Sequence, residues 1–513
     1  MTVGRALLSA WDKTGLAAFA EGLDRLGVEL VASGGTARFL VDAGLRVTPV
    51  DELTGFGEML GHRVVTLHPA VHAGILARRD VPDDLADLER FGIAPFDLVC
   101  VNLYPFEATV ARLDVGWQEA IEKIDVGGPA MLRAAAKNHA HVVTLCDVAD
   151  YETVLEELGA TGTVSEETRR CLATRAFATT AAYDAAVATW LGRGGDLPET
   201  YLAVFDRALE LEYGENPHQR AAYYVQRGQR THLLSRMEQL HGKPLSYNNL
   251  NDLTAARGLA AELERPACVI VKHANPCGVA VAETADDAYT KALACDPVSA
   301  YGGVVALTGP VSAALGETLV AQFVEVLLAP GFDEQALKAL VAKPGMRILA
   351  DHERRALEGD GVDLRRVPGG LLAQDHDEGT VRLEEMRVVC GEVDEGTRAD
   401  VMFAWLVAKH AASNAIVLAK DGMTIGIGSG QTSRVDAARL ALDKARTHGH
   451  DPAGAVLASD GFFPFADGPA LALEAGVAVI VQPGGSKRDD EVVAAVREAG
   501  AAMVLTGRRH FRH

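Results

Sequence analysis

The first 190 residues alternate short apolar runs with segments of helical periodicity, and this alternation constrains the fold more than any other feature. Apolar runs at Arg5–Ala10, Val28–Ala32 and Phe96–Asn102 each precede a segment that we expect to contain a helix, and His141–Cys146 is a further run of the same kind. Strands that alternate with helices favour a parallel sheet covered by helices. The sequence therefore predicts an α/β fold for this part of the chain.

The length of 513 residues exceeds what one hydrophobic core normally supports, so we expect at least two domains. An alanine-rich helical pattern ends at Trp190-Leu191 and gives way to the glycine-rich stretch Gly192–Pro198. Glycine and proline clusters of this kind mark linkers. We therefore predict one domain over residues 1–196 and a second over residues 197–513.

Composition narrows the classes of partner. The chain carries 49 basic and 70 acidic residues, and a net charge of −21 argues against a nucleic acid or an anionic membrane as partner. Its seven cysteines show no CxxC or Cys/His spacing, which indicates reduced and mostly buried thiols rather than a disulfide or zinc framework. We find no signal peptide and no run of ~20 apolar residues, so we expect a cytoplasmic protein.

The apolar run Val269–Val271 delivers Lys272 and His273 into a segment that contains Pro276 and Gly278. We expect a strand that ends in a proline and glycine turn at this point. A histidine can move a proton near neutral pH, and an adjacent ammonium can stabilise developing negative charge. The pair therefore indicates proton-transfer chemistry on an anionic substrate. The alternative, which a lone Lys-His pair favours, is that both residues simply cap a strand at the surface.

Two further segments are candidates for binding anions. Ser33-Gly34-Gly35-Thr36 lies between an apolar run and a helical segment, where backbone N–H groups can cradle a phosphate. An ordinary strand-to-helix turn is the alternative. The basic C-terminus, Gly507–His513, is either a solvated tail or a segment that docks into a site.

An ordered set of motifs resembles the bifunctional purine-biosynthesis family that joins an IMP cyclohydrolase to an AICAR (5-aminoimidazole-4-carboxamide ribonucleotide) transformylase. The resemblance covers nearly the whole chain and rests on SAWDKTG, LVASGGTA, RVVTLHPAVHAGILARRD, NLYPF, KIDVGGPAMLRAAAKNH, YGENPHQ, LSYNNLND, KHANPCG, DPVSAYGG, SNAIVLAKDG, GQTSRVD, SDGFFPFAD and the terminal RRHFRH. It implies a methylglyoxal-synthase-like parallel α/β domain followed by a transformylase region of two cytidine-deaminase-like α/β layers. It also implies that this region has no catalytic metal, which agrees with the absence of a PCxxC motif at Pro276-Cys277.

For the transformylase step, the resemblance implies that the amino group of AICAR attacks the formyl carbon of 10-formyltetrahydrofolate. His273 is then the base, Lys272 assists the leaving folate nitrogen or the oxyanion, and Asn414 positions the formyl group. The residues implied to contact AICAR are Tyr213, Gly302, Glu325, Arg434 and Arg509, and those implied to line the folate pocket are Val435, Phe462, Asp467, Ser486 and Lys487.

For the cyclohydrolase step, the resemblance implies ring closure of formyl-AICAR to IMP. This reaction is intramolecular, so correct positioning supplies much of the catalysis. The implied catalytic residues are Lys137, Asp125 and Tyr104, and the implied substrate contacts are Lys13, Ser33, Gly34, Gly35, Thr36, Arg63, Thr66 and Asn102. The resemblance also implies a homodimer whose transformylase sites are shared between chains.

Three positions depart from the family pattern. Val65 and Trp11 stand where the family usually has lysine and serine, and Glu212 stands where it usually has a phosphate-facing arginine. The substitution of Tyr301 for the usual phenylalanine is mild. An alternative reading is therefore that only residues 197–513 catalyse and that the first domain is a nucleotide-binding or dimerising module.

Overall fold

The computed structural model describes residues 2–57, 59–61, 63–112, 114–193, 197–229, 231–264, 266–352, 362–377, 379 and 381–513. The chain divides into two compact units, which we call the N-terminal unit (Met1–Val204) and the C-terminal unit (Phe205–His513). Gly194–Asp196 of the expected linker lie outside the described residues, and the expected boundary after residue 196 stays a prediction.

In the N-terminal unit the described residues form a parallel sheet of five strands in the order β3-β2-β1-β4-β5. The strands are β1 (Arg5–Ala10), β2 (Glu29–Ala32), β3 (Thr48–Pro49), β4 (Leu98–Asn102) and β5 (Val143–Leu145). The helices are α1 (Leu16–Arg25), α2 (Gly34–Asp42), α3 (Val50–Thr54), α4 (Pro69–Leu76), α5 (Pro82–Phe91), α6 (Phe106–Val110), α7 (Trp117–Ile121), α8 (Gly127–Lys137), the 3₁₀ helix η1 (Val148–Asp150), α9 (Tyr151–Thr161) and α10 (Glu166–Leu191).

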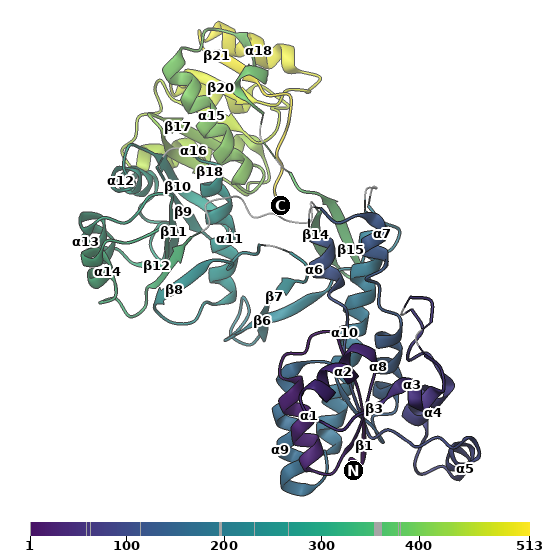
Figure 1. The fold of residues 1–513 in the computed structure, drawn as a ribbon. Helices are drawn as coiled ribbons and strands as arrows, with labels where there is room; N and C mark the ends of the chain where they lie inside the picture. The colour runs from purple at the N-terminus through teal and green to yellow at the C-terminus, as the bar shows by residue number, and fades with distance from the viewer. Residues whose placement is uncertain are drawn as a thin grey trace. The chain divides into compact units, whose positions relative to one another are not determined.

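Alternation along the central strand explains why helices cover both faces of this sheet. Ala6 and Leu8 of β1 pack in a core with α1 and α9, which lie side by side in Figure 1, whereas Leu7 packs in a second core with α4 and α8. The predicted parallel, helix-covered sheet is therefore confirmed.

In the C-terminal unit the described residues form a mixed sheet of twelve strands in the order β16-β21-β20-β19-β17-β18-β10-β9-β11-β12-β13-β8. These strands are β8 (Met237–His241), β9 (Ala267–Lys272), β10 (Asn275–Val281), β11 (Gly303–Leu307), β12 (Val324–Ala329), β13 (Arg347–Asp351), β16 (Arg387–Cys390), β17 (Ile416–Lys420), β18 (Met423–Gly428), β19 (Val456–Ser459), β20 (Val479–Gln482) and β21 (Ala502–Leu505). Two separate hairpins pair β6 (Phe205–Leu211) with β7 (Ala221–Gln226) and β14 (Val362–Val367) with β15 (Gly370–Asp375).

The large sheet consists of two halves with the same succession of elements: a helix, a β-hairpin, and three further strands that alternate with helices. The helices of the first half are α11 (Tyr247–Ala261), α12 (Ala285–Cys295), α13 (Ala313–Ala321) and α14 (Glu334–Leu340). Those of the second half are α15 (Glu395–His410), α16 (Arg434–Thr447), α17 (Asp467–Glu474) and α18 (Asp489–Glu498), preceded by the 3₁₀ helix η2 (Leu383–Glu385). The halves meet where β10 pairs antiparallel with β18.

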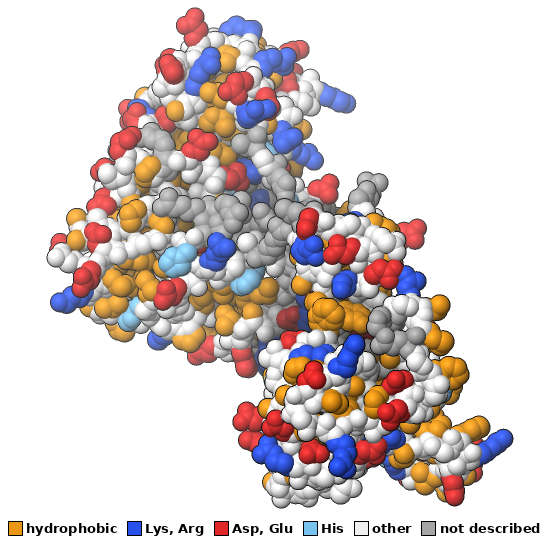
Figure 2. Space-filling view, in the orientation of Figure 1, with side chains coloured by type: hydrophobic (Ala, Val, Ile, Leu, Met, Phe, Trp, Pro, Cys, Tyr) orange, Lys and Arg blue, Asp and Glu red, His pale blue; other side chains and the backbone are white. Residues whose placement is uncertain are grey.

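One face of the large sheet packs on α11 and α15, and the other packs on α12–α14 and α16–α18. Figure 1 shows α11 on one side of β9–β11 and α12, α13 and α14 together on the other. Acidic and basic side chains are interspersed over the face drawn in Figure 2, so on that face the net negative charge is not gathered in one patch.

Strand directions place several loops at one end of the large sheet. Because β9 runs antiparallel to both β10 and β11, its last residue lies beside their first residues. The pairings of β10 with β18, β18 with β17, and β17 with β19 extend this edge across the second half. We call this edge, which carries the ends of β9, β18, β19, β20 and β21 and the starts of β10, β11, β12 and β17, the Lys272 end.

Two local predictions were wrong in detail. The turn after β9 consists of His273 and Ala274, because Pro276 and Gly278 belong to β10. Gly34 and Gly35 do not form a loop ahead of a helix, because they make up the first turn of α2. At the turn after β9, the backbone N–H of Ala274 donates to Asp252, which lies earlier in the chain.

All seven cysteines are free thiols, as expected, and five of them are buried. Within the described ranges no helix is both long and apolar enough to cross a bilayer. The expected cytoplasmic location stays a prediction.

Candidate active sites

A cavity of about 700 Å³ opens in the N-terminal unit at the carboxyl ends of β1 and β4. Ligands of parallel α/β sheets usually bind at this end of the strands. The cavity brings together most of the residues that the sequence predicts for ring closure: Lys13, Ser33, Gly34, Gly35, Thr36, Arg63, Thr66, Asn102, Tyr104 and Asp125.

The amino terminus of α2 forms the wall of this cavity that is suited to a phosphate. The hydroxyl of Ser33, which precedes the helix, lies 2.7 Å from that of Ser9. The ammonium of Lys13 lies 3.3 Å from the hydroxyl of buried Thr36 and also donates to the carbonyl of Ala10. Burial lowers the pKa of Lys13. A helix start and an ammonium together favour an anionic group at this wall.

Asp125 and Tyr104 form a second wall. Asp125 Oδ1 accepts a hydrogen bond from the backbone N–H of Gly128 at 2.8 Å, and the N–H of Tyr104 also donates to this carboxyl group. The backbone N–H of Asp125 donates to the hydroxyl of Tyr183 at 2.7 Å. Burial raises the pKa of Asp125, and the two backbone hydrogen bonds oppose that shift. The carboxyl group is therefore held in one orientation towards the cavity.

Asn102 anchors the loop that follows β1. Its Oδ1 atom accepts from the N–H groups of Trp11 at 2.6 Å and Asp12 at 3.0 Å. The ring of Trp11 meets the ring of Tyr104 edge-on, with their centroids 5.1 Å apart. The ammonium of Lys123 lies 4.9 Å from the centroid of the Trp11 ring. Trp11 thus brings a cation near the cavity, a contact that the sequence analysis missed.

Arg63 and Thr66 line the same cavity, and so does Val65. Arg63 pairs with Glu122, with Nε and Oε2 3.3 Å apart, so part of its charge is already matched. Both unusual residues of the first domain, Val65 and Trp11, therefore line the cavity together with the predicted site residues.

Lys137 is the one predicted ring-closure residue that the described lining of this cavity does not include. It is the exposed last residue of α8, whereas Gly127 at the other end of that helix lines the cavity. Its predicted role as proton donor or acceptor stays a prediction.

In the C-terminal unit, Lys272 ends β9 and His273 follows it in the hairpin turn. The ammonium of Lys272 donates to the carbonyl of Gly302 at 2.8 Å. The side chain of His273 is exposed at the Lys272 end of the sheet. Glycine is required at position 302, because a Cβ there would lie 2.9 Å from the ring of Phe323 and 3.3 Å from the Lys272 ammonium.

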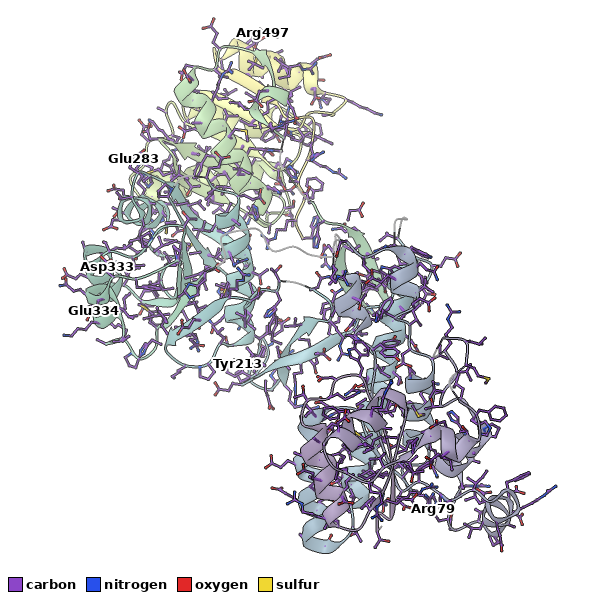
Figure 3. The ribbon with its side chains drawn as sticks, viewed as in Figure 1. Arg79, Tyr213, Glu283, Asp333, Glu334 and Arg497 are labelled. Carbon is purple, nitrogen blue, oxygen red and sulfur yellow. The ribbon has the colours of Figure 1, made fainter. Side chains whose placement is uncertain are left out.

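Glu325 and Tyr213 lie near the start of α11. The carboxylate of Glu325 accepts from the side-chain amide of Asn249 at 2.9 Å. Tyr213 comes shortly after the end of β6 (Figure 3), and the amide of Asn248 donates to the carbonyl of Glu215 in the same loop at 3.3 Å. Glu325 therefore contacts the first turn of α11, and the loop that carries Tyr213 contacts the same turn through Glu215.

Glu212, the third departure from the family pattern, is exposed just after β6. Because Glu212 is next to Tyr213, its carboxylate would repel a phosphate bound beside that tyrosine.

Asn414 lies in the second half of the large sheet, directly before β17. Its side-chain amide and its backbone N–H both donate to the carbonyl of Gln431, at 2.9 and 3.0 Å. Asn275 connects this segment to Lys272 and His273, because its Oδ1 atom accepts a hydrogen bond from the backbone N–H of Ala412 at 2.9 Å. His273 is two residues before Asn275, and Asn414 is two residues after Ala412. One hydrogen bond therefore connects the two segments that carry these predicted catalytic residues.

Asp460 organises the surroundings of Asn414. It is fully buried, and its carboxylate accepts from Arg434, from the hydroxyl of Ser413 and, at 3.1 Å, from the backbone N–H of Ala415. Arg434 also donates to the hydroxyl of Ser459 at 3.0 Å. Asp460 lies in the quoted motif SDGFFPFAD, but its contacts span 25 or more residues, so no local pattern assigns it this role.

The predicted folate residues follow the same edge. Val435 is next to Arg434 in the first turn of α16, Phe462 and Asp467 lie between the end of β19 and the start of α17, and Ser486 and Lys487 follow β20. All of them belong to loops or helix starts at the Lys272 end.

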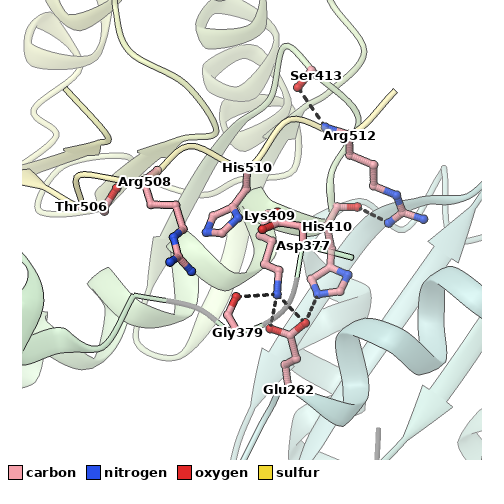
Figure 4. A network of polar contacts seen from close by, with 10 residues as sticks. All are labelled: Glu262, Asp377, Gly379, Lys409, His410, Ser413, Thr506, Arg508, His510 and Arg512. Atoms are coloured by element: carbon pink, nitrogen blue, oxygen red, sulfur yellow. Dashed lines mark hydrogen bonds and ion pairs between the residues drawn. The ribbon is translucent and has the colours of Figure 1, made fainter. Parts of the chain in front are cut away.

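The C-terminal tail packs on its own unit. His510 is buried, and its backbone N–H donates to the carbonyl of Asp460 at 3.1 Å while its Nδ1 lies 2.6 Å from Asp377 (Figure 4). The guanidinium groups of Arg434 and Arg509 lie 5.5 and 4.6 Å from the centroid of the Phe511 ring. Of the two alternatives for the tail, these contacts within its own unit favour docking, and its place in a shared transformylase site stays a prediction.

A further link of the tail runs through Arg512 (Figure 4). Arg512 donates to the carbonyl of His410 at 2.8 Å and accepts from the N–H of Ser413 at 2.8 Å. His410 and Lys409, the last two residues of α15, both contact Glu262, at 2.8 and 2.9 Å. The tail is therefore hydrogen-bonded to Ser413, the residue that precedes the predicted catalytic residue Asn414.

A larger cavity, of about 1,790 Å³, is lined by the turn at Asp421 and Gly422 and also by Glu262, Asp377 and Lys409 of the network in Figure 4. Its described lining residues include none of the predicted site residues, and acidic side chains outnumber basic ones among them. The size of a cavity therefore does not identify the active site of this unit, because the residues predicted for formyl transfer lie at the Lys272 end.

Within the residues that the structure describes, no group of three or more His, Cys, Asp or Glu side chains is arranged to hold a metal ion. The expectation of a site without a catalytic metal stays a prediction.

The fold and these residues are typical of an enzyme with an α/β cavity suited to an anion in one unit and a lysine–histidine pair at a sheet edge in the other. The profile of the MGS-like domain matches residues 15–130, and the profile of the AICARFT/IMPCHase bienzyme matches residues 135–444. The chain is 50% identical over 522 aligned positions to the bifunctional purine biosynthesis protein PurH of Roseobacter denitrificans, covering 99% of this chain and 98% of that protein. This chain therefore belongs to the AICARFT/IMPCHase bienzyme family.

Among solved structures, that of ForH is 42% identical to this chain, covers 37% of it and 100% of the ForH chain, and superposes with a TM-score of 0.33. The family membership confirms the resemblance found in the sequence and with it a methylglyoxal-synthase-like first domain. The chain is a bifunctional enzyme of purine biosynthesis, an AICAR formyltransferase and an IMP cyclohydrolase. The reading in which the first domain is only a binding module is not favoured.

Proposed function

We propose that the two activities occupy the two residue groups described above, formyl transfer at the Lys272 end of the large sheet and ring closure in the cavity of the N-terminal unit. The assignment of formyl transfer rests on the hydrogen bond from the backbone N–H of Ala412 to Asn275. This bond joins the two halves of the sheet, and it connects the segment of His273 to the segment of Asn414. The formyl donor in this proposal is 10-formyltetrahydrofolate.

In formyl transfer, His273 takes the proton from the amino group of AICAR as that nitrogen attacks the formyl carbon. Lys272 stabilises the oxyanion or assists the leaving folate nitrogen, and Asn414 orients the formyl group. AICAR contacts Tyr213, Gly302, Glu325, Arg434 and Arg509, and the folate contacts Val435, Phe462, Asp467, Ser486 and Lys487.

In ring closure, the carboxamide nitrogen of formyl-AICAR attacks its own formyl carbon and water leaves. The phosphate is held at the start of α2 by Ser33–Thr36 and Lys13, with Arg63 and Thr66 nearby. Asp125, Tyr104 and Asn102 surround the reacting amide. Because the reaction is intramolecular, fixing the amide against the formyl group supplies much of the rate.

A homodimer with shared transformylase sites is part of the proposal. Large aromatic side chains are exposed at the Lys272 end, among them Tyr301 at 65%, Phe465 at 51% and Phe323 at 48% of their surface. A row of exposed aromatic rings at an active site is typical of a surface that a partner or ligand covers. Sedimentation at sub-micromolar protein tests this part, and a monomer with full formyl transfer activity would rule it out.

The experiment for the two activities uses the full-length protein. Formyl-AICAR supplied without folate should yield IMP, and AICAR with 10-formyltetrahydrofolate should yield formyl-AICAR and then IMP. If added formyl-AICAR is not converted while formyl transfer proceeds, the assignment of ring closure to the N-terminal cavity is wrong.

A further inference from the structure

The turn that presents His273 has an unusual backbone. His273 and Ala274 connect β9 and β10, with φ angles of 52° and 58°. Two-residue hairpin turns of this kind favour glycine, asparagine or aspartate at both positions, because a Cβ is strained at positive φ. Neither residue belongs to that group in this case. The turn therefore needs support from outside the hairpin.

Asp252 of α11 provides that support. Its Oδ1 atom accepts from the backbone N–H of Ala274 at 2.7 Å, and the N–H of His273 donates to the same carboxyl group. The side chain is partly buried. Burial raises the pKa of Asp252, while these two hydrogen bonds and the charges of His273 and Lys272 oppose that shift. The carboxylate thus bonds both N–H groups of the turn.

The second half of the sheet contains the same arrangement. Asp421 and Gly422 connect β17 and β18 with φ angles of 54° and 71°. Asp400 accepts from the N–H of each, at 2.8 Å in both cases. Asp400 lies as far from the start of α15 as Asp252 lies from the start of α11.

The lysine before each turn is also equivalent. Lys272 ends β9 and donates to the carbonyl of Gly302 at 2.8 Å, and Lys420 ends β17 and donates to that of Ala453 at 2.7 Å. The two turns differ in what they present, since Asp421 occupies the position of His273. The helix aspartate is therefore a general support for the turn, and only the first copy carries an imidazole.

We propose that Asp252 is a positioning residue for formyl transfer, which fixes the backbone of His273 so that its imidazole meets the amino group of AICAR. The proposal rests on the role proposed above for His273. Without the carboxylate, the turn can relax to less strained conformers and carry the imidazole away from the substrate. A displacement of about 1 Å can reduce a rate by about 10²-fold.

The test compares variants of the full-length protein. Asp252→Ala should lower kcat for formyl transfer by about 10²-fold, with KM values for AICAR and folate within about twofold of wild type. Asp252→Asn keeps one acceptor and should recover part of that loss. The matched control is Asp400→Ala, which removes the same two hydrogen bonds from a turn without histidine and should leave kcat unchanged.

A rescue variant separates positioning from general stability. Glycine adopts positive φ without strain, so Ala274→Gly added to Asp252→Ala should restore part of kcat. An equal loss of kcat in Asp252→Ala and Asp400→Ala, or full kcat in Asp252→Ala, would overturn the proposal. If Asp252→Ala does not fold, Asp252→Asn and Asp400→Asn are compared instead. A lower kcat in Asp252→Asn alone supports the proposal, and an equal kcat in the two variants overturns it.

The same assays distinguish this proposal from the one on which it rests. Formyl transfer that survives His273→Ala would refute the role of His273 itself. Loss of activity in His273→Ala with full activity in Asp252→Ala would refute only the positioning role.

Discussion

Val65 lies in the wall of the N-terminal cavity beside Thr66, close to where a phosphate or amide would bind. A lysine at this position would add a charge-assisted donor, since Arg63 is already paired with Glu122. We expect Val65→Lys to raise ring-closure activity or nucleotide affinity by about tenfold, which corresponds to about 1.4 kcal/mol.

Val65→Met is the control, because it adds length without charge. Steady-state ring closure and nucleotide titration measure the effect. If Val65→Lys lowers both in a folded protein, then Trp11, with Lys123 over its ring, has rebuilt the pocket in a different way.

The carboxyl group of Asp125 predicts a pH dependence for ring closure. Burial raises its pKa, so in the folded protein it takes up a proton at a higher pH than an ordinary aspartate does. The ionised form accepts from Gly128, and protonation weakens that contact. Ring closure should therefore fall as the pH decreases through the raised pKa of Asp125, above the usual value of about 4.

This fall in activity at low pH is measured as the rate of IMP formation from formyl-AICAR between about pH 4 and pH 7, and it forms the acid limb of the pH profile. Asp125→Asn carries no titrating group, so its residual activity should show no such limb. A limb that persists in Asp125→Asn would assign it to another group.

At the scale of the elements, the C-terminal tail is the segment whose removal is most informative. Deleting Arg508–His513 removes the hydrogen bonds of His510 to Asp460 and of Arg512 to Ser413. The segment next to Asn414 then loses its support, so formyl transfer should fall by at least about tenfold. Ring closure should be unchanged, because the residues proposed for it belong to the other unit.

Arg508→Ala is the control for this deletion, since the side chain of Arg508 is exposed. Separate assays of the two reactions in each variant give the comparison. Full formyl transfer by the truncated protein would show that the tail has no part in that site.

The elements also show which parts of the fold a sequence can predict. The runs at Arg5–Ala10 and Phe96–Asn102 predict β1 and β4 because buried parallel strands are apolar throughout. The turn at His273 was misplaced, because local residue preferences point to Pro276 and Gly278 whereas the turn depends on Asp252, in a helix earlier in the chain. The role of Asp460 was missed for the same physical reason: contacts distant in sequence determine it.

For the whole molecule, the central proposal is that each unit carries its own chemistry. The ring-closure residues gather in one cavity of the N-terminal unit, apart from Lys137. The formyl-transfer residues come from segments far apart in sequence, and they share one edge because β10 pairs with β18. The family motifs supply the proposed members of both groups, and their roles stay predictions, whereas this pairing across the sheet has no signal in the sequence.

The most direct test is a crossed assay of two variants of the full-length protein. His273→Ala should lose formyl transfer and close added formyl-AICAR at close to the wild-type rate, and Asp125→Asn should transfer the formyl group normally and lose ring closure. Circular dichroism and thermal unfolding establish that both variants are folded. An equal loss of both activities in either folded variant would contradict the division of chemistry between the two units.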